Sequence, residues 1–108
     1  MANTFKSNVA ANIVTSGNTV YTCPSATQTT LIGMTLSNKS AGTVTANVYL
    51  TRSAVDYSLI SNAPILSGST LVPIGGDQKV VLQASDVLKV TTSANGAVDV
   101  IASLLEIA

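Results

Sequence analysis

Residues that could carry chemistry are few in this sequence. The chain has no histidine and a single cysteine, Cys23. Histidine is the commonest general base and the commonest metal ligand in proteins, and a thiol nucleophile needs a neighbouring base to activate it. One cysteine also cannot supply the ligand set of a structural zinc site. We therefore expect no catalytic residue, no metal and no cofactor, and we expect Cys23 to be a small apolar residue of the core.

The five acidic residues are dispersed along the chain, as Asp56, Asp77, Asp86, Asp99 and Glu106. Two carboxylates held close together can perform acid–base catalysis, and several oxygens from one loop can bind calcium. Three of these carboxylates fall at or beside predicted turns, which favours roles in turns and at strand ends. The GGD segment at 75–77 lacks the lysine and hydroxyl spacing of a phosphate-binding loop, and it also predicts a turn.

The three tyrosines, Tyr21, Tyr49 and Tyr57, are the remaining residues that often recognise ligands. Tyrosine can form a platform for sugars, but the chain has no tryptophan to extend such a platform. Tyr49 is predicted to point outward from a strand, where an aromatic side chain packs against its cross-strand neighbour or against another protein. Tyr49 and Tyr57 are therefore candidate interface residues.

The composition describes a small and weakly charged protein. The 108 residues suffice for one domain, 46% of them are apolar, only 9% are charged, and the net charge is zero. A chain without excess positive charge cannot neutralise a run of phosphates, so we expect no nucleic-acid partner. It has neither a signal-peptide pattern nor an apolar run long enough to span a bilayer, so we expect no membrane partner. Uncharged surfaces repel their own copies weakly, which favours self-association.

Short segments of alternating apolar and polar residues recur along the chain, separated by turn residues. This pattern predicts an all-β protein, an antiparallel β-sandwich of the jelly-roll or immunoglobulin-like type, with about eight short strands. Residues 18–108 form the single sandwich domain, and residues 1–17 are an N-terminal arm or a first strand. We expect 29–38 and 43–51 to pair as a hairpin, and Asn95-Gly96 to open a second hairpin before the last strand. Gly33 predicts a bulge. The expected strands are 19–23, 29–38, 43–51, 55–60, 71–74, 79–83, 87–92 and 98–107.

The last segment, residues 98–107, is apolar on both of its faces. Val98, Val100, Ala102 and Leu104 alternate as in a strand, whereas Ala, Leu and Glu residues leave a helix as an open alternative. We favour the strand, because β-branched residues lead the segment. One face would then pack inside the sandwich, and the other needs a neighbouring subunit to cover it. The candidate interface residues on this second face are Ile101, Leu105 and Ile107.

Three stretches of the sequence resemble a group of small virion proteins of tailed bacteriophages. They are VYTCP at 20–24, LIGMTLSN at 31–38, and KVVLQASDVLKV at 79–90 followed by VDVIASLLE at 98–106. Ser85 stands where these proteins usually have glycine, so we expect a different turn there. The resemblance carries no catalytic residues.

The resemblance implies a non-enzymatic structural protein of the virion, assembled in the cytoplasm of the host bacterium. The favoured role is capsid decoration, in which a small oligomer such as a trimer docks on the particle. Its partners would be copies of itself and the major capsid protein or neck proteins. Two alternatives remain: a neck, collar or tail accessory protein, and a host-surface recognition module that uses the loops of 53–68 with Tyr57 as an anchor.

Overall fold

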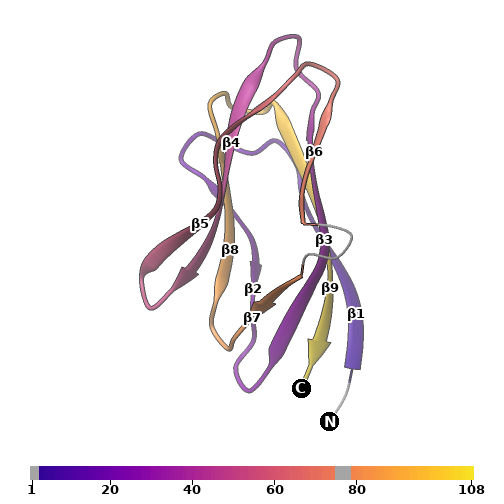
Figure 1. Ribbon diagram of the computed structural model, residues 1–108, viewed down its shortest axis with the longest axis vertical. Helices are drawn as coiled ribbons and strands as arrows, with labels where there is room; N and C mark the ends of the chain where they lie inside the picture. The colour runs from indigo at the N-terminus through magenta and orange to yellow at the C-terminus, as the bar shows by residue number, and fades with distance from the viewer. Residues whose placement is uncertain (1–2, 75–78) are drawn as a thin grey trace.

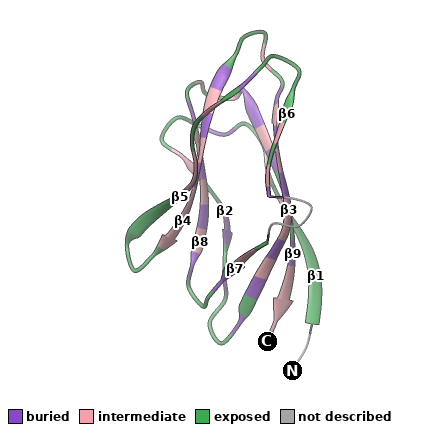
Figure 2. Ribbon diagram, in the orientation of Figure 1, coloured by how far each residue is buried: buried purple, intermediate pink, exposed green. Residues whose placement is uncertain are grey.

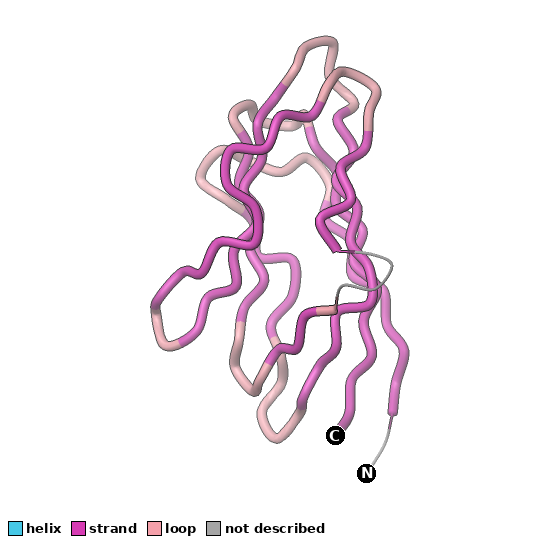
Figure 3. The backbone as a smooth tube through the Cα atoms, viewed as in Figure 1, coloured by secondary structure: helices cyan, strands magenta, loops and turns pink. Residues whose placement is uncertain are grey.

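The computed structural model describes residues 3–74 and 79–108, and it forms a two-layer β-sandwich (Figure 1). The described residues contain strands and loops but no helix, and therefore no helix that could cross a membrane (Figure 3). The predicted turn at 75–77, including Asp77, lies outside the described residues. The strands are β1 (Asn3–Ala10), β2 (Asn18–Thr22), β3 (Gln28–Asn38), β4 (Val44–Arg52), β5 (Val55–Ile65), β6 (Thr70–Ile74), β7 (Val80–Leu82), β8 (Val87–Thr92) and β9 (Val98–Ile107).

Two antiparallel sheets make up the sandwich. The first sheet has the order β1-β9-β3-β6, with β7 also paired to β3, and the second sheet has the order β2-β8-β4-β5. The chain can be followed as one long hairpin, in which β1 pairs with β9, β2 with β8, β3 with β6 and β7, and β4 with β5. These pairs alternate between the two sheets. This arrangement is a jelly roll.

The predicted all-β antiparallel sandwich is thus confirmed, and the strand order selects the jelly roll from the two topologies that the sequence left open. The strand count exceeds eight because one strand position, beside β3, is divided between β6 and β7. The final segment is a strand, as favoured, and the helical alternative for it was wrong. Within the N-terminal segment of residues 1–17, residues Asn3–Ala10 form β1 at the edge of the first sheet.

Both predicted hairpins were wrong. β3 lies in the first sheet and β4 in the second, and β8 and β9 are divided in the same way. The polar turns at 39–43 and 93–97 therefore carry the chain between the two sheets instead of folding a strand back on its neighbour. The turn at 83–86 does the same between β7 and β8. In that turn Ser85 adopts a φ of 71°, the conformation that glycine favours, contrary to the expected change of turn.

A bulge in β3 determines which of its side chains reach the core. The pairing of β3 with β9 shifts between Leu31 and Gly33, which confirms the bulge predicted at this glycine. The shift changes the phase of the alternation, so Leu31 and Met34 are both buried although they are three residues apart. Ile32, which a strict alternation would place on the same face as Met34, is only half-buried. A strict period of two could not predict this change.

The core lies between the two sheets, where the buried residues of both inner faces meet (Figure 2). Val98, Val100, Ala102 and Leu104 of β9 are all buried, as the alternation predicted. Ile13, in the loop after β1, is also fully buried, so this loop closes one end of the core. The largest fully buried side chains are Ile13, Leu31, Met34, Leu36, Ile65, Ile74, Leu82, Leu88 and Leu104.

Two strands with prolines lie at sheet edges. β5 continues through Pro64 to Ile65, where a loop was predicted, and it lies at the edge of the second sheet. β6 contains Pro73 and ends the strand order of the first sheet. Proline cannot donate to a neighbouring strand, so an edge is where a sheet tolerates it.

Candidate functional site: the outer face of the first sheet

The ionisable side chains that the structure describes form no cluster that would hold a metal. Across residues 3–74 and 79–108, no group of three or more acidic, cysteine or histidine side chains could bind one. The described carboxylates lie in separate places. Asp86 pairs with Arg52, Asp99 with Lys39, and Glu106 with Lys6. Asp56 accepts a hydrogen bond of 2.5 Å from the Thr51 hydroxyl group. Their geometry is that of turns and strand ends.

The ion pair of Arg52 with Asp86 holds the β7–β8 turn. Arg52 Nε lies 2.9 Å and 3.1 Å from the two oxygens of Asp86, and the backbone N–H of Gln83 donates to Asp86 Oδ2 over 2.7 Å. Asp86 is only 2% exposed. The hydrogen bonds from Arg52 lower the pKa of Asp86, and the same bonds raise the pKa of Arg52. These contacts stabilise a turn and leave no carboxylate oxygen free for chemistry.

A second polar cluster lies between the sheets near the two ends of the chain. The Tyr21 hydroxyl group donates to Glu106 Oε2 and lies 2.8 Å from Thr29 Oγ1. Burial, followed by the hydrogen bond to Glu106, raises the pKa of Tyr21, and the same bond lowers the pKa of Glu106. Cys23 is 1% exposed, and its sulfur lies 3.3 Å from Thr29 Oγ1. The prediction of a buried Cys23 is therefore confirmed.

The outer face of the first sheet is the most apolar exposed surface that the strand pairing creates. Residues directly opposite each other in paired strands point to the same side. The pairing aligns Phe5 with Leu105, Leu105 with Thr30, and Thr30 with Val81 in one row across the sheet. A second row aligns Val9, Ile101 and Thr35.

Several large apolar side chains on this face are open to solvent. Phe5 is 75% exposed, Val9 70%, Ile101 53% and Val81 50%. Figure 2 shows β1 as exposed along nearly its whole length. Exposed surfaces with several large apolar side chains are common at sites of interaction, including contacts between proteins.

The outer face of the second sheet is polar by comparison. Thr19, Lys89, Tyr49 and Ser58 are aligned across β2, β8, β4 and β5. A neighbouring row brings Asn47 beside Thr91, and the Asn47 amide donates to the Thr91 hydroxyl group over 3.0 Å. Hydroxyl, amide and ammonium groups are what a solvated sheet face displays. The outer face of the second sheet is therefore more polar than that of the first.

The five residues predicted for an interface lie on three different surfaces. Ile101, Leu105 and Ile107 share the outer face of the first sheet. Tyr49 lies on the outer face of the second sheet. Tyr57 pairs with Leu50 and therefore points to the other side of that sheet from Tyr49, in the β4–β5 hairpin that projects at the left of Figure 1.

The sequence analysis missed Phe5 and Val9, which are the most exposed large apolar residues of the face. A signal for them was present, because Phe5, Ser7 and Val9 alternate with Thr4, Lys6 and Asn8 in the manner of a strand. The apolar positions of that strand point outward and its polar positions point inward, which is the reverse of the usual order. Asn8 illustrates the inward positions, since its amide donates to the Val20 carbonyl oxygen over 3.1 Å.

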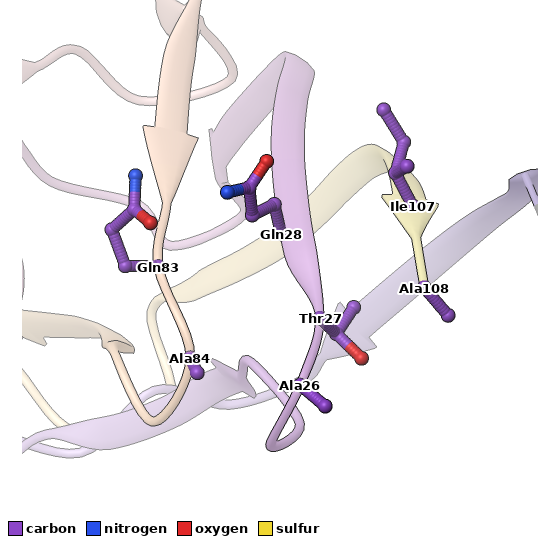
Figure 4. Close-up of a pocket in the computed structure, with 7 residues that line it drawn as sticks. All are labelled: Ala26, Thr27, Gln28, Gln83, Ala84, Ile107 and Ala108. Carbon is purple, nitrogen blue, oxygen red and sulfur yellow. The ribbon is translucent and has the colours of Figure 1, made fainter. Parts of the chain in front are cut away.

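The surface also has two shallow hollows, of which the first borders this face at Gln28 and Ile107. One, of about 350 Å³, lies between the start of β3, the end of β7 and the end of β9 (Figure 4), and is lined by Ala26, Thr27, Gln28, Gln83, Ala84, Ile107 and Ala108. Its side chains include two amides and no ionisable group, so we assign it no ligand. The other, of about 320 Å³, lies on the second sheet and is lined by Ser16, Gly17, Asn18, Thr19, Tyr49, Asp56, Lys89 and Thr91.

Comparison with known proteins adds a similarity of fold. No protein-family model and no curated protein matches the sequence. The structure is similar to a chain in the crystal structure of the T13 IBDV viral particle, with a TM-score of 0.52 and 9% sequence identity. The match covers 96% of this chain and 30% of that one, so this chain spans less than a third of its neighbour's length. At this identity the similarity establishes a shared fold, found in a chain of a virus particle.

Proposed function

We propose that this chain is a non-enzymatic structural protein of a tailed-bacteriophage particle, which decorates the capsid as a small oligomer. The observation that carries the proposal is the uncharged outer face of the first sheet, with Phe5 75% and Val9 70% exposed. A face of this kind is stabilised when another protein covers it. The similarity of fold to a chain of a virus particle supports the setting, as do the strand motifs shared with phage virion proteins.

The chain's chemistry suits binding better than catalysis. Each acidic residue that the structure describes is engaged by a neighbouring side chain, as Asp86 is by Arg52. The zero net charge lets many copies approach one another on a crowded shell. Modest affinity at each contact becomes durable attachment when several contacts form together.

Labelling of whole particles tests the proposal. An antibody against the chain is applied to particles of the phage that encodes it, and bound label is located by electron microscopy and counted. We expect label over the whole shell, at a copy number on the order of hundreds, because shell sites are repeated by symmetry. Label confined to the neck, at about a dozen copies, would favour the neck alternative. Particles without label would overturn a virion role altogether.

A second candidate function is recognition of a host-surface glycan by the hollow on the second sheet. Tyr49 offers an aromatic face there, and Asp56 and Lys89 offer charged hydrogen-bonding groups. A combination of one aromatic ring with a few polar groups is common in small-molecule sites. A glycan array probed with the purified protein tests this function, with Tyr49→Ala as the variant that should lose binding. Binding that survives in this variant would exclude the hollow as the site.

A further inference from the structure

We infer that a second copy of this chain covers the outer face of the first sheet, in a face-to-face dimer with two-fold symmetry. The inference names the partner of the face that carries the proposed function, and to that extent it rests on that function. Three features of the face support it: the absence of charge, the alternation of large and small side chains, and the area available.

On its described strands, the face offers no ionisable side chain that a charged partner would recognise, and Lys79 comes just before β7 at the margin of the face. From the Asn3 row to the Val9 row, the outward residues in strand register carry no ionisable side chain. Asp99, beyond the Val9 row, is paired with Lys39 at 3.0 Å. A charged partner would have to desolvate its own groups against this surface without compensation. A second copy presents an equally uncharged face on these strands, so no charge is left unpaired.

Large and small side chains alternate along the strands of this face. The row of Phe5, Leu105, Thr30 and Val81 forms one ridge, and the row of Val9, Ile101 and Thr35 forms another. Between them, the strand register aligns Ser7, Ser103 and Gly33, with the bulge residue Ile32 beside Gly33. We call this row the trough. Rows that are two residues apart along a strand are separated by about 7 Å, so an apolar side chain from another molecule fits between the ridges.

A two-fold axis parallel to the rows brings ridge and trough together. With the axis between the Phe5 row and the trough, the Phe5 ridge of each copy enters the trough of the other. The same rotation places the Val9 and Ile101 row of one copy over the row of Asn3, Ile107 and Gln28 of the other. Both contacts occur twice, as an isologous interface requires. The predicted interface residues Ile101, Leu105 and Ile107 all take part in it.

The face is large enough for a specific dimer of moderate strength. Four strand positions about 4.8 Å apart, each about seven residues long, give roughly 500 Å² on each copy. The total of about 1,000 Å² lies near the lower limit for specific protein interfaces. We therefore expect a dissociation constant in the micromolar range.

Sedimentation equilibrium of the full chain tests the dimer, with one variant for the ridge and one for the trough. Phe5→Ser removes the most exposed ridge residue, and Ser103→Tyr fills the trough. Both sites are exposed, so neither change disturbs the core. We expect each variant to raise the dissociation constant at least about tenfold. Ser103→Tyr is the more discriminating variant. It adds apolar surface, so it would strengthen association if the face bound its partner through non-specific hydrophobic contact, whereas it should weaken a dimer in which the ridge must enter the trough.

Matched controls apply the same changes elsewhere on the molecule. Tyr57→Ser removes an aromatic residue that is 54% exposed, and Ser58→Tyr adds one on the outer side of β5. Both controls should dimerise as the unmodified chain does. A chain that stays monomeric at about 1 mM would overturn the inference, as would a trimer or tighter association of Ser103→Tyr. If particles are labelled but sedimentation shows no dimer, this inference is rejected and the proposed function stands. If sedimentation shows the dimer but particles are not labelled, the proposed function is rejected and this inference stands.

Discussion

Tyr21 on β2 donates its hydroxyl hydrogen to Glu106 on β9, and this bond joins the two sheets beside the ends of the chain. Tyr21 is 5% exposed, and its hydroxyl group also lies 2.8 Å from that of Thr29. Lys6, on the edge strand β1, completes the cluster with its ammonium group 3.1 Å from the Glu106 carboxylate. A single carboxylate thus connects three strands where apolar packing ends.

Tyr21→Phe should lower the free energy of unfolding by about 1–3 kcal/mol. The phenylalanine keeps the ring in the core but leaves the partly buried Glu106 and the fully buried Thr29 without their hydrogen bond to the tyrosine hydroxyl group. Urea unfolding followed by circular dichroism measures the change. Tyr49→Phe is the control on the outer face of the second sheet, and it should stay within about 0.5 kcal/mol of the unmodified chain. Equal losses in the two variants would contradict a special role for the Tyr21–Glu106 bond.

Asp86→Asn should alter the dependence of stability on pH. The pKa of Asp86 is lowered in the folded protein, mainly by the hydrogen bonds from Arg52. The folded carboxylate therefore binds a proton less readily than the unfolded one. The stabilisation is present at neutral pH and is lost as the pH falls below about 4.

The asparagine variant cannot lose this contribution, so it should be less stable at pH 7 and should change less between pH 7 and pH 3. Urea unfolding at a series of pH values measures both effects. Arg52→Gln removes the main cause of the lowered pKa and should flatten the curve in the same direction. Parallel curves for all three proteins would show that the ion pair contributes nothing to acid sensitivity.

Ser85→Gly should stabilise the fold by up to about 1 kcal/mol. Ser85 holds a φ of 71°, where the side chain of an L-residue is crowded and glycine is not. Thermal unfolding measures the gain. Ser25→Gly is the control, because Ser25 is exposed and is not among the described residues with positive φ. There glycine only adds freedom to the unfolded chain, so the control should lose stability.

Gly17→Ala should destabilise the protein by about 1–3 kcal/mol. Gly17 has a φ of 100°, and a Cβ atom there would lie 2.9 Å from Thr91 Cγ2. Gly42→Ala is the matched control, since an added Cβ meets nothing within 4 Å and the φ of Gly42 is not positive. Comparison of the two unfolding midpoints checks the prediction. A Gly17→Ala midpoint at or above that of Gly42→Ala would contradict it.

Local alternation sufficed to predict the strands of this protein but not their partners. The segments that became β3, β4, β8 and β9 were placed within one or two residues, because the period of two reflects a sheet with one buried face. Pairing depends on contacts distant in sequence, such as Asn3 with Ile107. Short polar turns at 39–43 and 93–97 could serve a hairpin or a crossing between sheets equally well, and the sequence does not distinguish these uses.

Only part of the candidate site could be predicted, again because strand pairing cannot be inferred from local alternation. Ile101, Leu105 and Ile107 were found because one strand carried apolar residues on both faces. Phe5 and Val81 joined them only through pairing of β1 with β9 and of β7 with β3. Tyr49 and Tyr57 were grouped with them by residue type, and the fold separates them. An interface built across four strands is a property of the sheet and is visible only in fragments along the chain.

The pairing of Asn3 with Ile107 also has a mechanical consequence. Both described ends of the chain leave the molecule at the same pole (Figure 1). A force that pulls the two ends apart would break the hydrogen bonds between β1 and β9 one after another, so only a few bonds would resist it at any moment. A load that pulls β1 and β9 in opposite directions along their length would instead strain all of the rungs between them at once. We therefore expect the pairing of β1 with β9 to resist a shearing force along the strands far better than a force that separates the two ends of the chain.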